Sequence, residues 1–410
     1  MKKIWSTVLA LLLALTTLVV CTGSASAASA AADSAAVADG VNALNWKLYD
    51  AMIGENNTFY SAYSIESAFA MMDAGAKGRT KKQMEKVLGI KDIDKFLKQY
   101  QAYISQKQSG VSTLKTANGI WMNTNKISMD SVNPTYVSNM KKYMGATVKA
   151  EPFTNATSGE ITGFVNKATD GYMSDYKSII KPTYTMDLLN CIYFDGKWEE
   201  PFDPKNTTSK EFFGKDRMFR VNTMRLNNKY FQYYDNGKFN ALNLPYKDSN
   251  YVMTLVLPDG GTEDKSVAEQ WRSTSHADRD KFLKALDGAG YEKINTLSLP
   301  RFHQDITESG LPGIMKKLGM TDAFIGGVAD FSGIAKDLYI DNVNHRAKID
   351  VDEQGTKAAA VTEIGVMTTS MAPQPQRIIN FICNHPYLYF IRDTSNGMVL
   401  FTGVMNTMKK

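Results

Sequence analysis

The stretch DEQGTKAAAVTEIGV, residues 352–366, alternates in character from one position to the next. From Thr356 onward every second residue is small or apolar, whereas the other set holds the only two charges of that part, Lys357 and Glu363. A period of two separates the faces of a β-strand. Three successive alanines also favour a helix, but the β-branched residues and the glycine that follow oppose its continuation. Pro373 and Pro375 then interrupt regular structure. The stretch predicts a loop that can become a strand.

The first part of the chain is mainly helical, and the later part is rich in strands. Thr80 is expected to cap a helix that Gly89 ends. A second helix is expected where one face carries Ile161, Phe164, Val165, Ala168 and Tyr172. Strands are expected at 251–258 and in a hairpin formed by 387–391 and 398–405 around the turn 394–397. Helices and strands that do not alternate predict a single α+β domain over residues 40–410.

The N-terminus has the features of a secretory signal peptide, residues 1–27. Lys2 and Lys3 precede an uncharged apolar stretch, and Ala25-Ser26-Ala27 supplies small residues for cleavage. The apolar stretch is short for a membrane anchor. A lipid anchor at Cys21 is a second alternative, disfavoured by the bulky residue before it. We expect a secreted bacterial protein with a short Ala/Ser-rich linker, residues 28–39, and no membrane attachment after processing.

Composition excludes several classes of function. A net charge of +5 spread over 410 residues gives no concentrated basic face, so no nucleic-acid partner is expected. Processing leaves Cys191 and Cys383, both in apolar runs, and two buried thiols are a simpler explanation than a disulfide framework. Without a Cys-x-x-Cys pair we expect neither a zinc site nor another metal or cofactor.

Recognisable catalytic motifs are missing from the sequence. There is no G-x-S-x-G, H-E-x-x-H, P-loop or dinucleotide fingerprint, and only four histidines occur. A Ser/His/Asp triad scattered along the chain stays open, because triads are defined by geometry and not by spacing. We therefore expect a protein that is not an enzyme.

Short motifs in sequence order give the chain a resemblance to the serpin family over nearly its whole mature length. Asp352 to Ala360 looks like the hinge of the serpin reactive loop. Other segments that resemble the family are Asn57–Ser61, Gly75–Thr80, Leu189–Trp198 with Pro201–Asp203, Leu244–Tyr246, Leu299–Phe302, Leu318–Met320, Ala329–Gly333, His385–Ile391 and Leu400–Gly403. The resemblance implies one domain of about nine helices and three β-sheets, with an exposed reactive-centre loop at about 353–376.

The resemblance also implies roles for particular residues. Glu353 would open the loop, and Gly355, Thr356, Ala358, Ala359 and Ala360 would form its hinge. Ser61, Ser64, Asn190 and His345 resemble a polar cluster beneath the central strands of the main sheet. Trp198 resembles the aromatic residue where insertion begins, and Arg301 with Glu353 resembles a family ion pair. Lys357 and Val361 depart from the usual hinge, where the family often has Glu and a smaller residue.

The bond presented to a protease is placed at Thr369-Ser370 by family spacing from Gly355. The segment from Gly355 to Pro386 looks longer than usual, so Met371-Ala372 is an alternative if the extra length precedes the bond. Met367-Thr368 is the alternative if the loop is shorter than usual. Thr or Met as the recognised residue disfavours a trypsin-like target and fits subtilisin-like or elastase-like enzymes.

The function implied is suicide inhibition of an extracellular serine protease by a monomer, in which the cleaved loop enters the main sheet as a strand. A cysteine protease is the alternative target. The alternative function is a serpin-fold binding protein that does not inhibit. Such members usually carry bulky, charged or proline-containing hinges, which the run from Thr356 to Ala360 does not resemble.

Overall fold

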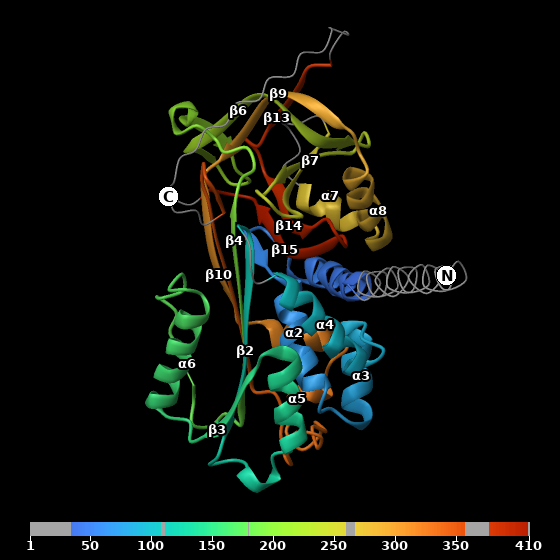
Figure 1. Ribbon diagram of the computed structural model, residues 1–410, viewed down its shortest axis with the longest axis vertical. Helices are drawn as coiled ribbons and strands as arrows, with labels where there is room; N and C mark the ends of the chain where they lie inside the picture. The colour runs from blue at the N-terminus through green and yellow to red at the C-terminus, as the bar shows by residue number, and fades with distance from the viewer. Residues whose placement is uncertain (1–33, 108–110, 179, 260–266, 357–376, 409–410) are drawn as a thin grey trace, which may run out of the picture.

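Two hydrogen-bonded β-sheets and a set of flanking helices make up the structure, a computed structural model that describes residues 34–107, 111–178, 180–259, 267–356 and 377–408. The molecule is elongated, with helices α2 to α6 around one end of it and α7 and α8 at the other (Figure 1). The α-helices of the described chain span residues 34–52, α2 Ala62–Asp73, α3 Gly78–Leu88, α4 Ile93–Lys107, α5 Pro134–Met144, α6 Asn155–Ala168, α7 Val267–Ser273, α8 His276–Asp287 and α9 Leu311–Leu318.

The larger sheet contains nine strands. In spatial order they are β1 Thr58–Tyr60, β15 Met398–Met405, β14 Tyr387–Asp393, β8 Tyr251–Pro258, β7 Phe239–Pro245, β6 Met218–Asp235, β9 Tyr291–Pro300 and β13 Ile379–Ile382, with β5 Thr208–Phe213 beside β6. The 18-residue strand β6 pairs with β7 at one end and with β5 and β9 elsewhere. The resemblance described above predicts three sheets. Because β6 pairs with β7 and also with β5 and β9, two of these sheets form one continuous sheet in the structure.

The smaller sheet contains six strands: β10 Phe302–Glu308, β11 Asn342–Val351, β12 Gly355–Thr356, β4 Met186–Lys197, β2 Thr113–Asn123 and β3 Thr147–Glu151. Its outer face carries α6, packed through Ile161 and Val165 on Leu189 and Trp121. Its inner face closes the largest core together with α2 and the larger sheet. The middle strand β4 is buried at nearly every position, although its sequence includes the polar residues Asp187 and Asn190.

The predicted elements are found, with adjusted ends. The strand at 251–258 and the hairpin of β14 and β15 are confirmed, and Cys191 and Cys383 are buried free thiols. The helix stopped by Gly89 in the left-handed conformation begins at Gly78, so Thr80 is not its cap. The Thr80 hydroxyl instead accepts a hydrogen bond from the backbone of Asp330.

The expected linker over residues 28–39 ends earlier than its composition suggests. Residues 34–39 are the first turns of the N-terminal helix, and Val37 and Ala38 are buried in the main core. The Ser34 hydroxyl also accepts a hydrogen bond from the Asn396 side chain. Alanine-rich sequence has high helix propensity, and apolar contacts fix this helix against the β14–β15 hairpin.

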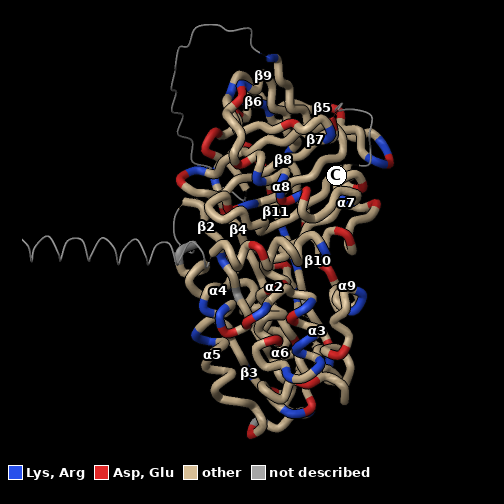
Figure 2. Tube along the Cα trace, turned by 90° about the vertical axis from the view of Figure 1, so that its right-hand side faces the viewer, with Lys and Arg blue, Asp and Glu red and all other residues tan. Residues whose placement is uncertain are grey.

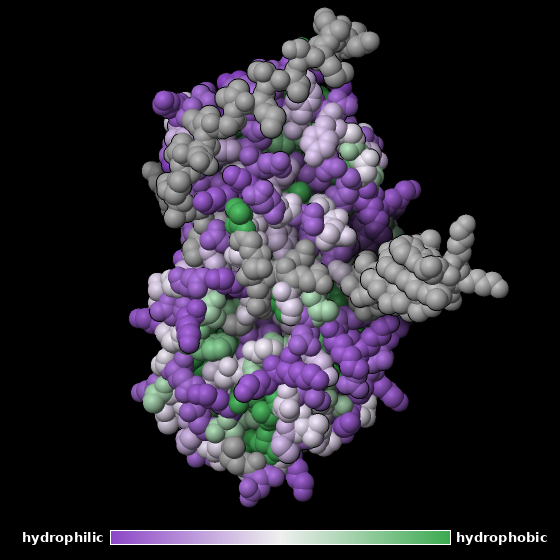
Figure 3. Space-filling model, in the orientation of Figure 1, coloured by the Kyte–Doolittle hydropathy of each residue, from purple (hydrophilic) through white to green (hydrophobic). Residues whose placement is uncertain are grey.

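Charges of both signs are interspersed along the whole molecule (Figure 2). On the face seen in Figure 3, hydrophilic side chains predominate and apolar ones form small separate groups. Across the described ranges, no helix combines the length and hydropathy needed to cross a bilayer.

Candidate functional site

The two central strands of the smaller sheet are paired in their first half only. Residues 342–345 of β11 run parallel to 187–190 of β4, in direct register. Further along, the two-residue strand β12 lies between them: Thr356 pairs with Val351 of β11 and with Gly196 of β4. The sheet is therefore already split at one end, and the wedge is the chain segment that leads into residues 357–376.

A tight turn returns the chain from β11 into this wedge. The Asp352 amide donates to the Gly355 carbonyl at 3.1 Å, and the Asp352 carboxylate accepts from the Gln354 amide at 2.8 Å. Gly355 is required here: a Cβ on it would lie 2.1 Å from the Gly196 carbonyl oxygen. The segment 353–356 was expected to begin an exposed loop, but Glu353 and Thr356 are buried and Gly355 belongs to the sheet. The loop therefore starts after Thr356.

Trp198 and Tyr246 contact the turn and the wedge through hydrogen bonds. The Trp198 amide donates to the Gln354 carbonyl and its indole N–H to the Asp352 carbonyl, both at 2.9 Å. Its ring stacks on Tyr246 with centroids 4.5 Å apart. The Tyr246 and Thr356 hydroxyls are hydrogen-bonded at 2.5 Å. The sequence identifies Tyr246 only as part of the motif Leu244–Tyr246, because no local pattern predicts its contact with Thr356.

Glu353 anchors the other side of the turn. Its carboxylate lies 2.7 Å from Arg301 Nε and also accepts from the Thr207 hydroxyl. Burial alone would raise the pKa of Glu353, but the hydrogen bonds from Arg301 and Thr207 outweigh it, so that the pKa lies below its usual value. The glutamate is therefore held as a carboxylate, in an ion pair whose partner is partly exposed.

The four polar residues Ser61, Ser64, Asn190 and His345 meet where β11 and β4 are still paired. All four are buried. His345 Nε2 accepts from the Ser61 amide at 3.3 Å, and the Ser64 hydroxyl donates to the Asn190 side chain. Burial lowers the pKa of His345 to about 4, so the ring is neutral at physiological pH.

Asn118 of β2 completes this polar cluster and was missed from sequence. Its amide oxygen accepts from Asn190, and its amide nitrogen donates to the Met144 carbonyl at 2.8 Å. β2 carries several other polar residues, so nothing in its sequence singles out Asn118. The cluster thus ties β4 and β11 to the first turn of α2, which Ser61 caps.

The segment after α6 crosses the outer face of the same two strands. Arg346 of β11 pairs with Asp175 of this segment and with Asp305 of β10, each at 2.5 Å. Tyr172 donates to the Asp350 carboxylate at 2.6 Å, and Lys348 donates to the Tyr172 carbonyl at 3.1 Å. These bonds tether the segment to β11, opposite the polar cluster.

The remaining predicted residues lie outside the described ranges. They are the hinge alanines Ala358, Ala359 and Ala360 and the candidate bond residues Met367, Thr369, Ser370 and Met371.

Comparisons with known proteins agree with this geometry. The pattern of the Serpin (serine protease inhibitor) family matches residues 39–407. The chain is 30% identical to Iripin-2 of Ixodes ricinus over 86% of this chain and 88% of that protein. It is 31% identical to leukocyte elastase inhibitor A of Mus musculus, over 85% and 92%.

Solved structures show the same fold. The thermophilic serpin tengpin in its native state superposes with a TM-score of 0.80 at 26% identity, covering 90% of this chain and 93% of that one. Tengpin in its latent state gives a TM-score of 0.75 at 26% identity, over 92% and 98%. Human thyroxine-binding globulin, at 23% identity, shares the fold with a TM-score of 0.77 over 93% and 100%.

Proposed function

Because the chain belongs to the serpin family, we propose that it is a secreted inhibitor that traps serine proteases through insertion of its cleaved loop. The observation that carries the proposal is the wedge formed by Gly355 and Thr356 between β4 and β11. These two residues occupy the first positions of a strand antiparallel to both neighbours. An extended segment can join a sheet as an additional strand through main-chain hydrogen bonds, and the insertion of serpin loops is one instance of this mode of association.

Continuing the same register predicts the surroundings of each inserted residue. Extrapolated from the pairs of Thr356 with Val351 and with Gly196, Ala358 falls between Ile349 and Phe194. Ala360 falls between Ala347 and Ile192, and Ile364 between Val343 and Leu188. All six flanking residues are buried in the main core. Small and apolar residues at every second loop position fit this interior.

Polar positions of the loop meet polar positions of the sheet in the same register. Thr362 falls between His345 and Asn190, the pair at the centre of the polar cluster. Lys357, on the opposite face, falls between Asp350 and Asp195, which explains why a lysine suits this position where the family often has Glu. The departures from the usual hinge are therefore compatible with insertion.

The chemistry is supplied by the protease. Its serine oxygen attacks the carbonyl carbon of Thr369, the bond to the Ser370 nitrogen breaks, and the new amine leaves with a proton. The acyl ester then joins protease and inhibitor. Insertion carries the protease along the sheet before water can hydrolyse the ester. β11 must separate from β4 for this, which requires that the polar cluster rearrange and that the segment after α6 release Arg346 and Asp350 of β11.

The target class follows from the bond residues. Thr369, or Met367 or Met371 if the bond lies elsewhere, suits subtilisin-like or elastase-like proteases; a mouse relative is named as an elastase inhibitor. The signal-peptide features expected at residues 1–27 support an extracellular location for this activity. The competing function is ligand binding without inhibition, as in the thyroxine complex of a protein with this fold.

The test compares two adjacent substitutions in the loop after incubation with subtilisin and with neutrophil elastase. Wild type should form a complex that survives boiling in detergent. Ala358→Arg should be cleaved at the same bond without forming it, since a guanidinium between Ile349 and Phe194 would be buried unpaired, at a cost of several kcal/mol. Lys357→Arg, on the outward face, should inhibit like wild type.

Two outcomes would overturn the proposal. If Ala358→Arg inhibits at unchanged stoichiometry, the loop does not insert in this register. If wild type is only cleaved by every protease tested, and if its cleaved form melts no higher than the intact form, the binding-protein function is favoured instead.

A further inference from the structure

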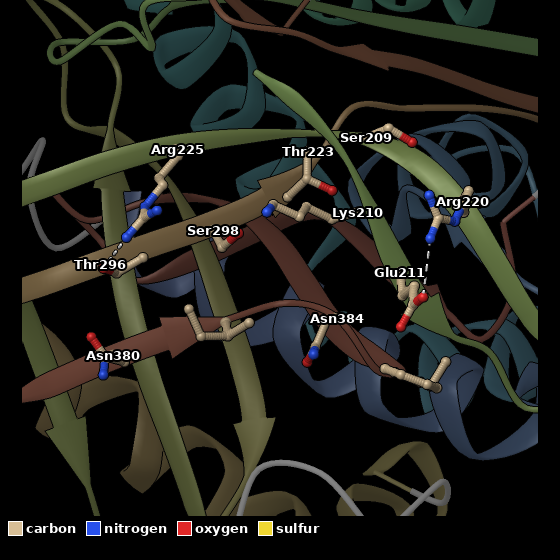
Figure 4. Close-up of a pocket in the computed structure, with 12 residues that line it drawn as sticks. Ser209, Lys210, Glu211, Arg220, Thr223, Arg225, Thr296, Ser298, Asn380 and Asn384 are labelled. Carbon is tan, nitrogen blue, oxygen red and sulfur yellow. Dashed lines mark hydrogen bonds and ion pairs between the residues drawn. The ribbon is translucent and has the colours of Figure 1, made fainter. Parts of the chain in front are cut away.

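A hollow of about 630 Å³ lies where β5, β6, β9 and β13 meet, away from the split in the smaller sheet (Figure 4). Ligand sites commonly enclose about 300–1,000 Å³. The hollow is therefore the size of a small-molecule site and larger than a single inorganic ion needs. The proposed inhibitory mechanism does not use it.

The charges around the hollow do not balance. Three cations line it, Lys210, Arg220 and Arg225, against one carboxylate, Glu211. Arg220 and Glu211 pair with each other at 3.4 Å at one end. Within the described chain, no carboxylate forms an ion pair with Lys210 or Arg225. These two side chains leave the centre of the hollow positive, and a ligand that carries negative charge would be attracted to it.

The geometry directs both cations to the same stretch of β9. The guanidinium of Arg225 donates to the Thr296 hydroxyl at 3.1 Å, which fixes its orientation. Lys210 extends from β5 toward the part of β9 that carries Ser298 (Figure 4). Two cations that reach neighbouring outward positions of one strand, Thr296 and Ser298, provide charge-assisted donors of the kind that phosphate oxygens accept.

The rest of the lining mixes polar residues with two apolar ones, Phe213 and Ile382. Thr296 and Ser298 of β9 add hydroxyls, and Asn380 of β13 and Asn384 just beyond it add amides. Hydroxyls and amides both donate and accept hydrogen bonds, as sugar hydroxyls do. An anion-binding centre beside an uncharged wall of polar and apolar residues matches a molecule with one charged group and a hydroxylated carbon body.

We propose that this hollow binds a sugar phosphate, with the phosphate between Lys210 and Arg225 and the sugar along Asn380 and Asn384. A ligand in this position contacts four strands at once and so links β13, the short strand that follows the loop, to β9 and β6. Binding to the folded state alone raises its stability by mass action. Thermal denaturation therefore reports on binding without any protease.

The test uses glucose 6-phosphate, inorganic phosphate and glucose as probes in calorimetric titration and thermal denaturation of the full chain. Glucose 6-phosphate should bind and raise Tm, inorganic phosphate should bind at least about tenfold more weakly, and glucose should not bind measurably. The double variant Lys210→Gln/Arg225→Gln should lose binding by about tenfold or more, as expected for lost hydrogen bonds to a charged group. Asn380→Ala should weaken glucose 6-phosphate and leave inorganic phosphate unchanged.

The matched control is Lys82→Gln/Lys98→Gln, which removes the same charge from exposed positions on α3 and α4. It should bind like wild type. Equal affinity of the two double variants would overturn the proposal, as would glucose 6-phosphate binding no more tightly than inorganic phosphate. If no probe binds and the effect of Lys210→Gln/Arg225→Gln is limited to slower association with a protease, the hollow is a docking surface for protein. The proposal is then wrong. Protease trapping by wild type is measured separately, so the two proposals fail independently.

Discussion

Gly355→Ala should release the hinge from the smaller sheet. A Cβ at this position would lie 2.1 Å from the Gly196 carbonyl oxygen and 2.8 Å from Lys197 Cα. Both are backbone atoms of β4 directly after Asp195, which pairs with Thr113 of β2, so β4 cannot give way here without disturbing that pairing. Ejection of β12 is the easier response.

The cost of ejection follows from the bonds that the hinge makes. Three are lost: Trp198 amide to Gln354 carbonyl, Asp352 amide to Gly355 carbonyl, and Thr356 hydroxyl to Tyr246 hydroxyl. At about 1 kcal/mol for each hydrogen bond, the inserted state becomes about 3 kcal/mol less favourable. That corresponds to a shift of about a hundredfold in the equilibrium between inserted and released hinge.

Hydrogen exchange measures this shift directly. The amides of Trp198 and Asp352 should lose about a hundredfold protection in Gly355→Ala, and the fluorescence of Trp198 should change as Thr356 leaves the hydroxyl of Tyr246, the ring on which Trp198 stacks. The control is Gly54→Ala, where an added Cβ meets no atom within 4 Å. If the protection factors and melting temperatures of the two variants agree with wild type, the wedge does not depend on Gly355 and the reasoning fails.

Three further predictions concern buried charged and titratable groups. Burial raises the pKa of Asp73 to about 7, against a weaker opposing effect of Lys81, so the folded protein loses stability as pH rises from about 4 through 7 and this carboxyl must ionise. In denaturant unfolding, the free energy of unfolding of Asp73→Asn should exceed that of wild type by up to about 4 kcal/mol at pH 8 and by little at pH 4. Burial lowers the pKa of His345 to about 4, so wild type loses stability as pH falls below about 6.5. The amount by which His345→Gln is less stable than wild type should therefore shrink by about 2–3 kcal/mol between pH 7 and pH 4.5. A stability difference that does not change with pH would contradict this. Arg301→Met leaves the Glu353 carboxylate buried without its cation and should lower the free energy of unfolding by about 2 kcal/mol, a value discounted because Arg301 is partly exposed. Adding Glu353→Gln to this variant should restore part of the lost stability. Additive losses from the two substitutions would argue against an ion pair between Arg301 and Glu353.

The sequence by itself was sufficient for features that depend on neighbours along the chain. The two-residue period after Thr356 indicates a strand-forming loop because alternation is a local property of extended backbone. The β14–β15 hairpin and the end of α3 at Gly89 were predicted for the same reason, since turn and cap residues act within a few positions. Where local composition misled, at residues 34–39, apolar contacts with distant segments decided the outcome.

Only the tertiary structure decided which distant residues share a site. Asn118 joins Ser61, Asn190 and His345 because β2, β4, β11 and α2 converge there, and no spacing in the sequence encodes that meeting. The position of Gly355 and Thr356 inside the sheet depends likewise on a gap between β4 and β11, strands that are more than 100 residues apart in the chain. The hollow lined by Lys210 and Arg225 arises because β5, β6, β9 and β13 meet there, although β13 lies far along the chain from the other three strands. Local periodicity fixes which face a side chain takes, whereas strand order, which is set by burial of the whole core, fixes what that face meets.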